Sequence, residues 1–320
     1  MSSPTLPKIG DRLTDYVARI SQLREFKKKE GDGGFHIFRA TNAQGSIGCI
    51  IWSGRVDFRN GDFVRLSGEV KLHKDTPQFV VTRYEILPRD QFAAETFLPI
   101  SKRPLVEMVE ELKGYISMVN HPGVARMLTR LLIEDAVTAP AYQRAPAAKT
   151  HHHPFLSGLL EHNLTVVRRA LGLCLEEDGI DRDVVIAGAL LHDVGKVEEY
   201  TFDSEEIGFT EVGNLLGHVA LGYALVRKAI AEQGDIPTAT ATNLLHVILS
   251  HQGRLDYGSP VEPRTAEAFI VHHADTVDAH LFQLHRTGEE FPDTRLGFAK
   301  SLNRMVLGNP QLPYEEGYQH

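Results

Sequence analysis

The most constraining feature of this 320-residue chain is an entirely apolar segment, residues 184–191, that runs directly into His192 and Asp193. A helix that is apolar on all sides is buried on all sides, so other helices must surround it. Such a helix delivers an imidazole and a carboxylate at its last turn, where an unpaired buried carboxylate is costly. Solvent exposure or a bound cation would remove that cost. Gly195 is expected to cap the helix.

Further metal-ligand residues lie on other apolar segments of the C-terminal half. Histidine is abundant, with 16 copies, yet residues 1–90 contain only His36 and His73. Taken singly, each histidine is more commonly a packed or surface residue than a ligand. Together, several histidines and aspartates converging inside a helical bundle would bind borderline divalent metals. The predicted ligands are His162, His192, Asp193, His218, His251 and Asp275.

Residues 13–87 have the pattern of a small β-domain. Alternating or apolar stretches are separated by turn signals, among them residues 31–34 and 60–62. The predicted strands are residues 16–20, 35–40, 47–52, 63–72 and 79–86. This number of strands in so short a stretch suits a closed barrel, most commonly the oligonucleotide-binding (OB) fold. A barrel that serves only subunit packing is the alternative.

The rest of the chain is predicted to be helical to its end. The predicted domains are an OB-fold domain at 1–90, a proline-containing linker at 91–104 and an all-helical domain at 105–320. Pro122 suits the first turn of a helix. The predicted helices are residues 105–119, 122–133, 155–176, 184–191, 215–232, 238–250 and 265–285.

Charge is divided unequally between these two parts. Residues 1–90 carry 15 Lys and Arg against 11 Asp and Glu, a net +4, whereas residues 91–320 carry 19 against 31, a net −12. An acidic domain that acts on a polyanion needs metal ions or a basic neighbour. The two cysteines, Cys49 and Cys174, exclude a disulfide framework. With no apolar run long enough to cross a bilayer and no secretory signal, a cytoplasmic protein is expected.

The ordered ligands H…HD…H…H…D resemble those of the HD-domain phosphohydrolases. The resemblance is closer to the YhaM-type 3′-5′ exoribonucleases, which join an N-terminal OB domain to an HD domain. Its motifs are Ala145-Pro-Ala-Ala-Lys149 with His152-His153, Ser157-Gly-Leu-Leu-Glu-His162, Leu191-His-Asp-Val-Gly-Lys196 and Gly258-Ser-Pro-Val261. It covers nearly the whole chain, strongly from about residue 140 to 285.

The resemblance implies a site for two divalent ions. His162, His192 and Asp275 would hold the first ion and His218 and His251 the second, with Asp193 bridging them. Mn²⁺ is the first expectation, and Fe²⁺, Co²⁺, Ni²⁺ and Mg²⁺ are alternatives. Such a pair activates a water and neutralises phosphate oxygens. Lys196, His152 and His153 join Asp193 as catalytic candidates, each with a structural alternative.

The sequence departs from the resembled pattern at one position. Relatives often have two adjacent histidines where this chain has His251-Gln252. The ligand His251 is retained, whereas any supporting role of the second histidine is in doubt. The second ion is therefore expected to bind more weakly or with a different selectivity.

Single-stranded RNA or DNA is the expected partner of the barrel, through stacked aromatic rings and basic side chains. Because alternate strand residues face the core, about half of these candidates are expected to be buried. The candidates are Trp52, Phe38, Phe58, Phe79, Arg39, Arg55, Arg65, Lys71 and Lys74. No membrane partner is expected, and a homo-oligomer is left open.

The predicted function is a metal-dependent 3′-5′ exoribonuclease that releases nucleotides from single-stranded RNA, with single-stranded DNA as a second substrate. One alternative is an HD-type nucleotidase or cyclic-nucleotide phosphodiesterase, since a fold does not set its substrate. The other is a nucleic-acid-binding protein with an inactive HD site. Occupation of all six ligand positions argues against the inactive site, and the β-domain favours a polymer over a mononucleotide.

Overall fold

The structure is a computed structural model of the whole chain. It describes residues 7–27, 34–43, 45–73, 76–88, 98–150, 152–175, 177–202, 207–290, 296–299 and 302–307, without the side chains of 288–290. The chain divides into two compact units, one made of residues 1–102 and 201–207 and the other of residues 103–200 and 208–320, which are described separately. Residues 91–97 of the predicted linker lie outside the described residues.

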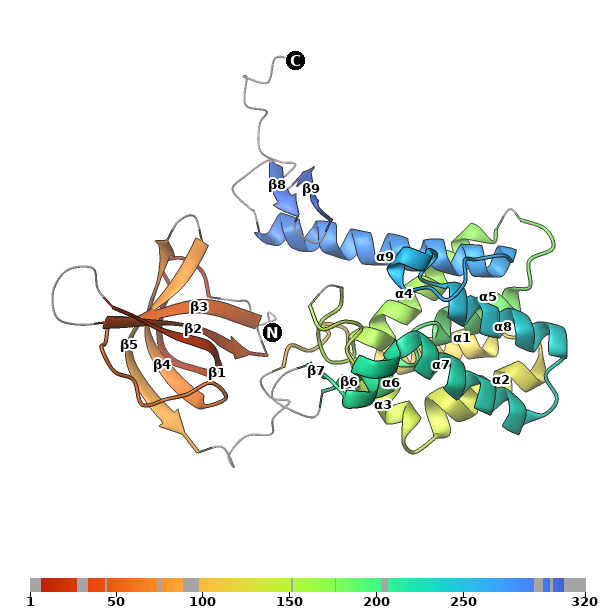
Figure 1. Ribbon diagram of the computed structural model, residues 1–320, viewed down its shortest axis with the longest axis horizontal. Coiled ribbons are helices and arrows are strands. Elements are labelled where there is room, and N and C mark those ends of the chain that lie inside the picture. Colours follow the sequence, from red (N-terminus) through yellow and green to blue (C-terminus); the bar gives the residue numbers. More distant parts are fainter. Residues whose placement is uncertain are drawn as a thin grey trace, which may run out of the picture. The chain divides into compact units, whose positions relative to one another are not determined.

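The N-terminal unit is a closed barrel in the strand order β1-β2-β3-β5-β4 (Figure 1). Its strands are β1 (Arg12–Lys27), β2 (Gly34–Asn42), β3 (Gly45–Ile51), β4 (Phe63–His73) and β5 (Thr76–Leu87). β3 and β5 run parallel, the other neighbours pair antiparallel, and β4 returns to pair with β1. The predicted five-stranded OB-type barrel is therefore confirmed.

Alternation along the strands sets the barrel core. In β2, residues 34, 36, 38 and 40 are buried, and the residues between them are partly exposed. The rings of Phe38 and Phe58 meet edge to face at 5.1 Å, and those of Tyr16 and Phe79 at 5.7 Å. Aromatic pairs of this geometry contribute beyond their buried area. The interior of the barrel is thus filled by side chains and leaves its outer face for contacts.

The C-terminal unit is mainly helical, as predicted (Figure 1). Its helices are α1 (Leu105–Ser117), α2 (Pro122–Thr129), a π-helical turn η3 (Arg130–Glu134), α3 (Thr138–Arg144), α4 (Gly158–Leu173), α5 (Arg182–Leu191), α6 (Lys196–Glu199), α7 (Glu211–Gln233), α8 (Thr238–Ser250), a 3₁₀ turn η4 (Leu255–Tyr257) and α9 (Ala266–Glu290). Pro122 is the first residue of α2, as predicted, and His121 caps that helix.

Helix α5 lies at the centre of this unit. Every residue from Asp183 to Leu191 is buried, and α5 packs against α4, α8 and α9. The side chain of Asp181 caps its start by accepting from the backbone N–H groups of Asp183 and Val184. Asp183 in turn accepts from the backbone N–H of Asn120 and of His121, just before α2. The apolar segment thus forms the buried helix that its composition predicts.

The expectation of helix to the end of the chain was wrong. Two short strands, β6 (Tyr200–Thr201) and β7 (Gly208–Phe209), pair between α6 and α7. A hairpin of β8 (Leu296–Ala299) and β9 (Arg304–Leu307) follows α9 and packs on it (Figure 1). Its residues alternate between exposed and buried, a period of two that fits a strand and not a helix.

Candidate metal centre

The six predicted ligands converge in the core of the helical unit. His162 comes from α4, His192 and Asp193 directly follow α5, His218 lies in α7, His251 directly follows α8, and Asp275 lies in α9. Helix α7 is interrupted at Gly217, whose φ is 71°, so a new helical run begins at His218. Side chains from five separate helices therefore meet at one point.

The first group of donors contains His162, His192 and Asp275. The Nε2 atom of His162 lies 3.2 Å from Nε2 of His192 and 3.2 Å from Oδ1 of Asp275. Oδ2 of Asp193 lies 3.6 Å and 3.5 Å from the same two ring nitrogens. The three ligand atoms of this group, with Oδ2 of Asp193 as a fourth, thus surround one position.

The second group contains Asp193, His218 and His251. Here the other carboxylate oxygen of Asp193, Oδ1, lies 3.4 Å from Nε2 of His218 and 3.5 Å from Nε2 of His251. Asp193 therefore directs one oxygen to each group, as a bridging ligand must.

Hydrogen bonds on the far side of each ring orient the imidazoles. Nδ1 of His192 donates to the carbonyl of Ala189 at 2.9 Å, and Nδ1 of His251 donates to the carbonyl of Ile248 at 2.7 Å. A carbonyl can only accept, so each Nδ1 carries the proton and each Nε2 presents a lone pair to the centre. This arrangement is typical of metal-binding histidines.

Two carboxylates perform the same task for the remaining rings. Nδ1 of His162 lies 2.6 Å from Oδ2 of Asp278, and Nδ1 of His218 lies 3.1 Å from Oε1 of Glu199. The sequence reasoning missed both carboxylates. For Asp278 the sequence did hold a signal: it follows the predicted ligand Asp275 by three residues and so lies on the same face of α9.

The donor set fits a divalent cation. Four ring nitrogens and two carboxylates bring mainly acceptor atoms together in a site where His162, His192 and His251 are completely buried. Oδ1 of Asp193 is buried and has no hydrogen-bond partner. Buried acceptors that face one another without a donor are costly, and a cation removes that cost. Nitrogen and oxygen ligands of this kind suit borderline divalent ions.

The same crowding shifts the pKa values at the site. Burial alone would raise the pKa of Asp193, but Lys196 and His192 hold it well below its usual range. The imidazole of His162 likewise outweighs burial and lowers the pKa of Asp275. Burial would lower the pKa of His162, yet hydrogen bonds to Asp275 and Asp278 raise it to about 9. Without a metal, a proton on His162 supplies part of the missing positive charge.

Lys196 is buried beside Asp193, and its Nζ lies 2.6 Å from Oδ2. It begins α6, which packs closely on α7.

The prediction that Gly195 caps the C-terminal end of the preceding helix was wrong, because its φ of −63° and ψ of −15° are helical. A Cβ at Gly195 would lie 2.0 Å from the carbonyl oxygen of His218. Glycine is needed there because the two backbones approach so closely.

The two histidines before α4 occupy different environments. The ring of His152 lies 5.0 Å from that of His162, and its Nε2 is buried without a hydrogen-bond partner. Burial lowers the pKa of His152 well below its usual value. The ring of His153 contacts Asp278 instead, with its Nε2 3.1 Å from Oδ2 of that carboxylate. His152 therefore borders the ligand cluster, whereas His153 contacts the carboxylate that supports His162.

Three of the predicted stacking residues cannot contact nucleic acid. Phe38, Phe58 and Phe79 are 1%, 2% and 0% exposed. Phe38 of β2 and Phe79 of β5 face the barrel core, and Phe58, in the segment between β3 and β4, packs against Phe38. This part of the prediction was wrong. Trp52, by contrast, is 59% exposed.

The predicted basic residues of the barrel also differ from one another. Arg65 lies 2.5 Å from both Asp15 and Glu85, so two carboxylates neutralise its charge. Lys71 lies 3.4 Å from Glu69, and Arg55 lies 3.5 Å from Asp57 in an exposed pair. Arg39 donates to the hydroxyl and carbonyl oxygens of Ser46. Lys74 lies outside the described residues.

Two aromatic residues that the sequence reasoning missed, Phe26 and Phe35, lie beside the predicted Trp52 on the barrel surface. Phe26 of β1 pairs with Phe35 of β2, and their rings stack at 5.3 Å with an interplanar angle of 12°. The ring of Phe35 also lies 5.0 Å from that of Trp52. The signal was the expected strand pairing, which places residues at the ends of adjacent strands side by side.

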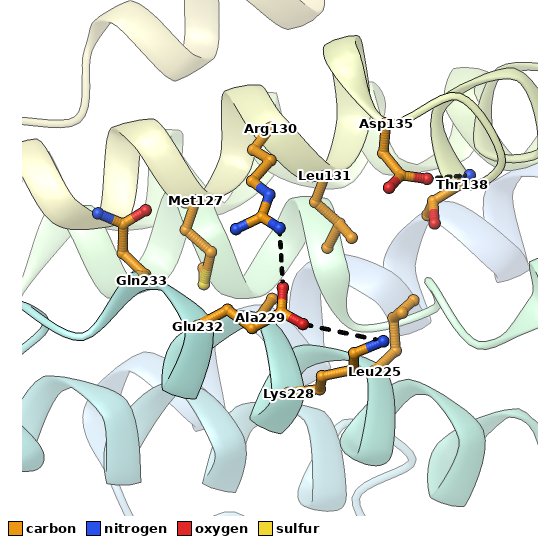
Figure 2. Close-up of a pocket in the computed structure, with 10 residues that line it drawn as sticks. All are labelled: Met127, Arg130, Leu131, Asp135, Thr138, Leu225, Lys228, Ala229, Glu232 and Gln233. Atoms are coloured by element: carbon orange, nitrogen blue, oxygen red, sulfur yellow. Dashed lines mark hydrogen bonds and ion pairs between the residues drawn. The ribbon is translucent and has the colours of Figure 1, made fainter.

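A pocket lies between the π-helical turn and α7 (Figure 2). Its Glu232 lies 3.0 Å from Arg130 and 3.8 Å from Lys228, so these charges are paired with one another. The metal ligands do not line this pocket. Among the described residues, no helix is both long and apolar enough to span a membrane.

Comparison with known proteins matches residues 159–280 to the HD domain. The 3′-5′ exoribonuclease YhaM of Bacillus subtilis (strain 168) is 30% identical over 289 residues, which cover 89% of this chain and 90% of that protein. The 3′-5′ exoribonuclease YhaM of Bacillus velezensis is 34% identical with the same coverage.

Among solved structures, the second OB-fold domain of replication protein A from Methanococcus maripaludis is 22% identical, with a TM-score of 0.21. The match covers 26% of this chain and 88% of the chain in that solved structure.

Proposed function

The chain belongs to the YhaM family of HD-domain 3′-5′ exoribonucleases, and we propose on this basis that it removes nucleotides from the 3′ end of single-stranded RNA. The observation that carries the proposal is the meeting of all six predicted ligands in the buried core of the helical unit, with Asp193 directed at both groups. A chain that had lost the activity would not need to keep a buried, cation-demanding cluster.

The centre would hold two divalent ions, with Mn²⁺ as the first choice. His162, His192 and Asp275 would hold one ion, His218 and His251 the other, and Asp193 would belong to both. Two such ions would neutralise phosphate oxygens and lower the pKa of a water molecule. The mixed nitrogen and oxygen donors are compatible with Mn²⁺ and also with Fe²⁺, Co²⁺ or Ni²⁺.

The chain's own side chains would position the substrate at this centre. Lys196, which lies beside Asp193, is placed to contact a phosphate oxygen as a compact positive charge. The unpartnered Nε2 of His152 is available for a second contact to the scissile phosphate. His153 would act indirectly, by holding Asp278 against His162.

The outer face of β1 and β2 would bind the single strand. Phe26 and Phe35, with Trp52 beside them, offer stacked rings to bases. Arg39 shares the outward side of β2 with Phe35, and Arg24 lies two residues before Phe26 on β1. Aromatic rings next to arginines are typical of surfaces that bind single-stranded nucleic acid without sequence preference.

The test uses the full-length protein loaded with Mn²⁺ and single-stranded RNA labelled at either end. Removal from the 3′ end releases labelled mononucleotide at once from 3′-labelled RNA and produces a descending ladder from 5′-labelled RNA. The same assay with single-stranded DNA, mononucleotides and cyclic dinucleotides addresses the alternatives. Turnover of the small substrates with intact RNA would contradict the proposal, as would RNA binding without any turnover.

A further inference from the structure

The side chain of Gln252 lies against both histidines of the second group. Its amide nitrogen is 3.0 Å from Nε2 of His251 and 3.3 Å from Nε2 of His218. These are the two ring nitrogens that face Oδ1 of Asp193. Gln252 therefore reaches the position that an ion held by these three residues would share.

The contact is that of a donor group with two acceptors. Nδ1 of His251 donates to a carbonyl, and Nδ1 of His218 faces the carboxylate of Glu199, so both Nε2 atoms present lone pairs. The amide NH₂ has two N–H donors and can satisfy both. Gln252 thus does for these two nitrogens, in the absence of a metal, what a cation does when bound.

The backbone around Gln252 is held in place on both sides. The carbonyl of His251 accepts from Nδ1 of His272 at 2.7 Å, and the N–H of Gly253 donates to the carbonyl of Ser250 at 2.8 Å. A Cβ at Gly253 would lie 2.1 Å from the ring of His272, and its φ of 79° favours glycine. This tight packing directs the side chain of Gln252 at His218.

We propose that Gln252 is a ligand of the second divalent ion, through its amide oxygen. The inference rests on the two-ion function proposed above. A half-turn about the last side-chain torsion exchanges Nε2 for Oε1, which converts the group from a donor to the ring nitrogens into an oxygen ligand. That torsion is soft, so the exchange needs no backbone movement.

An amide oxygen in place of a third imidazole changes which ions the second position prefers. Two nitrogens and two oxygens favour Mn²⁺ or Mg²⁺ more than three nitrogens would, because oxygen ligands suit these harder ions. The second position is therefore expected to bind Mn²⁺ more weakly than the first, and to favour Co²⁺ and Ni²⁺ over Mn²⁺ by less than a site with a third imidazole would. Gln252→His would shift its preference towards these two ions.

The experiment titrates metal-stripped full-length protein with Mn²⁺ by calorimetry and follows coupling between two Mn²⁺ ions by electron paramagnetic resonance. We expect Gln252→Ala to weaken the second binding step by about tenfold or more, the size typical of losing a residue that supports a metal. The first step should not change, and the coupled signal should be lost at equal metal concentration. Gln252→Glu should strengthen the second step, because it supplies a charged oxygen.

The matched control is Gln143→Ala, since Gln143 is a partly buried glutamine of the same unit that donates to the carbonyl of Leu132. It should leave both binding steps unchanged. An unchanged second step in Gln252→Ala would overturn the proposal. A tighter second step would overturn it too, and would make Gln252 a competitor of the metal. Gln252→Glu keeps the test decisive if the alanine variant folds poorly.

His218→Ala separates this inference from the proposed function. If His218→Ala loses the second step but Gln252→Ala retains it, only the role of Gln252 fails. If the unaltered protein binds a single Mn²⁺ and still degrades RNA, the two-ion centre fails together with the role of Gln252, while the exonuclease activity stands.

Discussion

The carboxylate of Asp278 lies 2.6 Å from Nδ1 of His162, on the side of the ring opposite the metal ligands. The same carboxylate contacts Nε2 of His153 at 3.1 Å and pairs with Arg169. Asp278 therefore links the predicted metal ligand His162 to two neighbouring side chains. It fixes the orientation of the His162 ring. Its negative charge also favours a positive charge at that ring, either a proton or a bound cation.

Asp278→Asn should weaken metal binding while retaining the fold. The amide keeps the shape of the side chain but loses the charge that orients His162, a change that typically costs about 10- to 100-fold in metal affinity. Metal content after dialysis against a graded series of chelator concentrations measures this. Asp256→Asn, at an exposed aspartate paired with Arg254, should have no effect. Equal affinities in the two variants would contradict the role of Asp278.

Lys196→Met should lower kcat without removing the metal. Loss of a positive charge that contacts phosphate typically costs about 100-fold or more in rate. Metal analysis and single-turnover degradation of a short RNA, performed on the same preparation, separate the two effects. Lys228→Met, at an exposed lysine, provides the control. If Lys196→Met loses its metal as well, Lys196 serves the ligand Asp193 instead of the substrate.

The stability of metal-free protein should fall as pH rises from about 6.5 to about 9. Hydrogen bonds to Asp275 and Asp278 raise the pKa of His162 to about 9, above the ordinary value of about 6.5 in the unfolded chain. A raised pKa stabilises the fold fully below the unfolded value, and this contribution is lost as pH passes the folded value. Denaturant unfolding in the presence of a chelator measures the trend. His162→Gln should remove it, and identical pH profiles for both proteins would exclude His162 as its source.

Phe35→Ala should raise KM for long single-stranded RNA by about tenfold and leave kcat on a dinucleotide unchanged. The ring stacks on Phe26 and contacts Trp52, and each stacked base contributes about 1–3 kcal/mol. Steady-state kinetics on RNAs of increasing length test this. Phe298→Ala removes an exposed ring of the helical unit and serves as the control. A length-independent loss of activity in Phe35→Ala would argue against stacking.

Phe79→Ala should instead destabilise the barrel. Its ring is fully buried and packs edge to face on Tyr16, and truncation of a buried phenylalanine typically costs about 3–5 kcal/mol. Denaturant unfolding measures the loss. A change in RNA affinity with unchanged stability would contradict the core position of Phe79.

The six predicted metal ligands could be selected from the sequence because they stand out chemically from their surroundings. His192 and Asp193 follow a fully apolar segment, and polar groups in such a place need compensation. The supporting residues could not be predicted as easily. Glu199 and Asp278 are ordinary acidic residues in sequence, and only the packing of α6 and α9 reveals which ring each one contacts.

In the barrel, too, the sequence indicated the elements but not which side chains are exposed. The alternation of apolar residues indicated its strands, but it could not say that Phe38 and Phe79 face inward while Phe35 and Trp52 face outward. A shift of one residue in strand register reverses the two faces. The register was set by pairing between strands, including the irregularity in β1 between Ser21 and Arg24.

Sequence alone thus predicts the barrel strands, the main helices and the buried polar side chains that need a compensating charge, because hydrophobic pattern and the cost of burying charge are local properties. Tertiary structure decides which atoms meet. Oδ1 and Oδ2 of Asp193 face different histidine pairs, and Gln252 reaches the two histidines of one pair, because the helices that carry these residues pack in one particular way. Contacts between residues so distant in the chain depend on that packing.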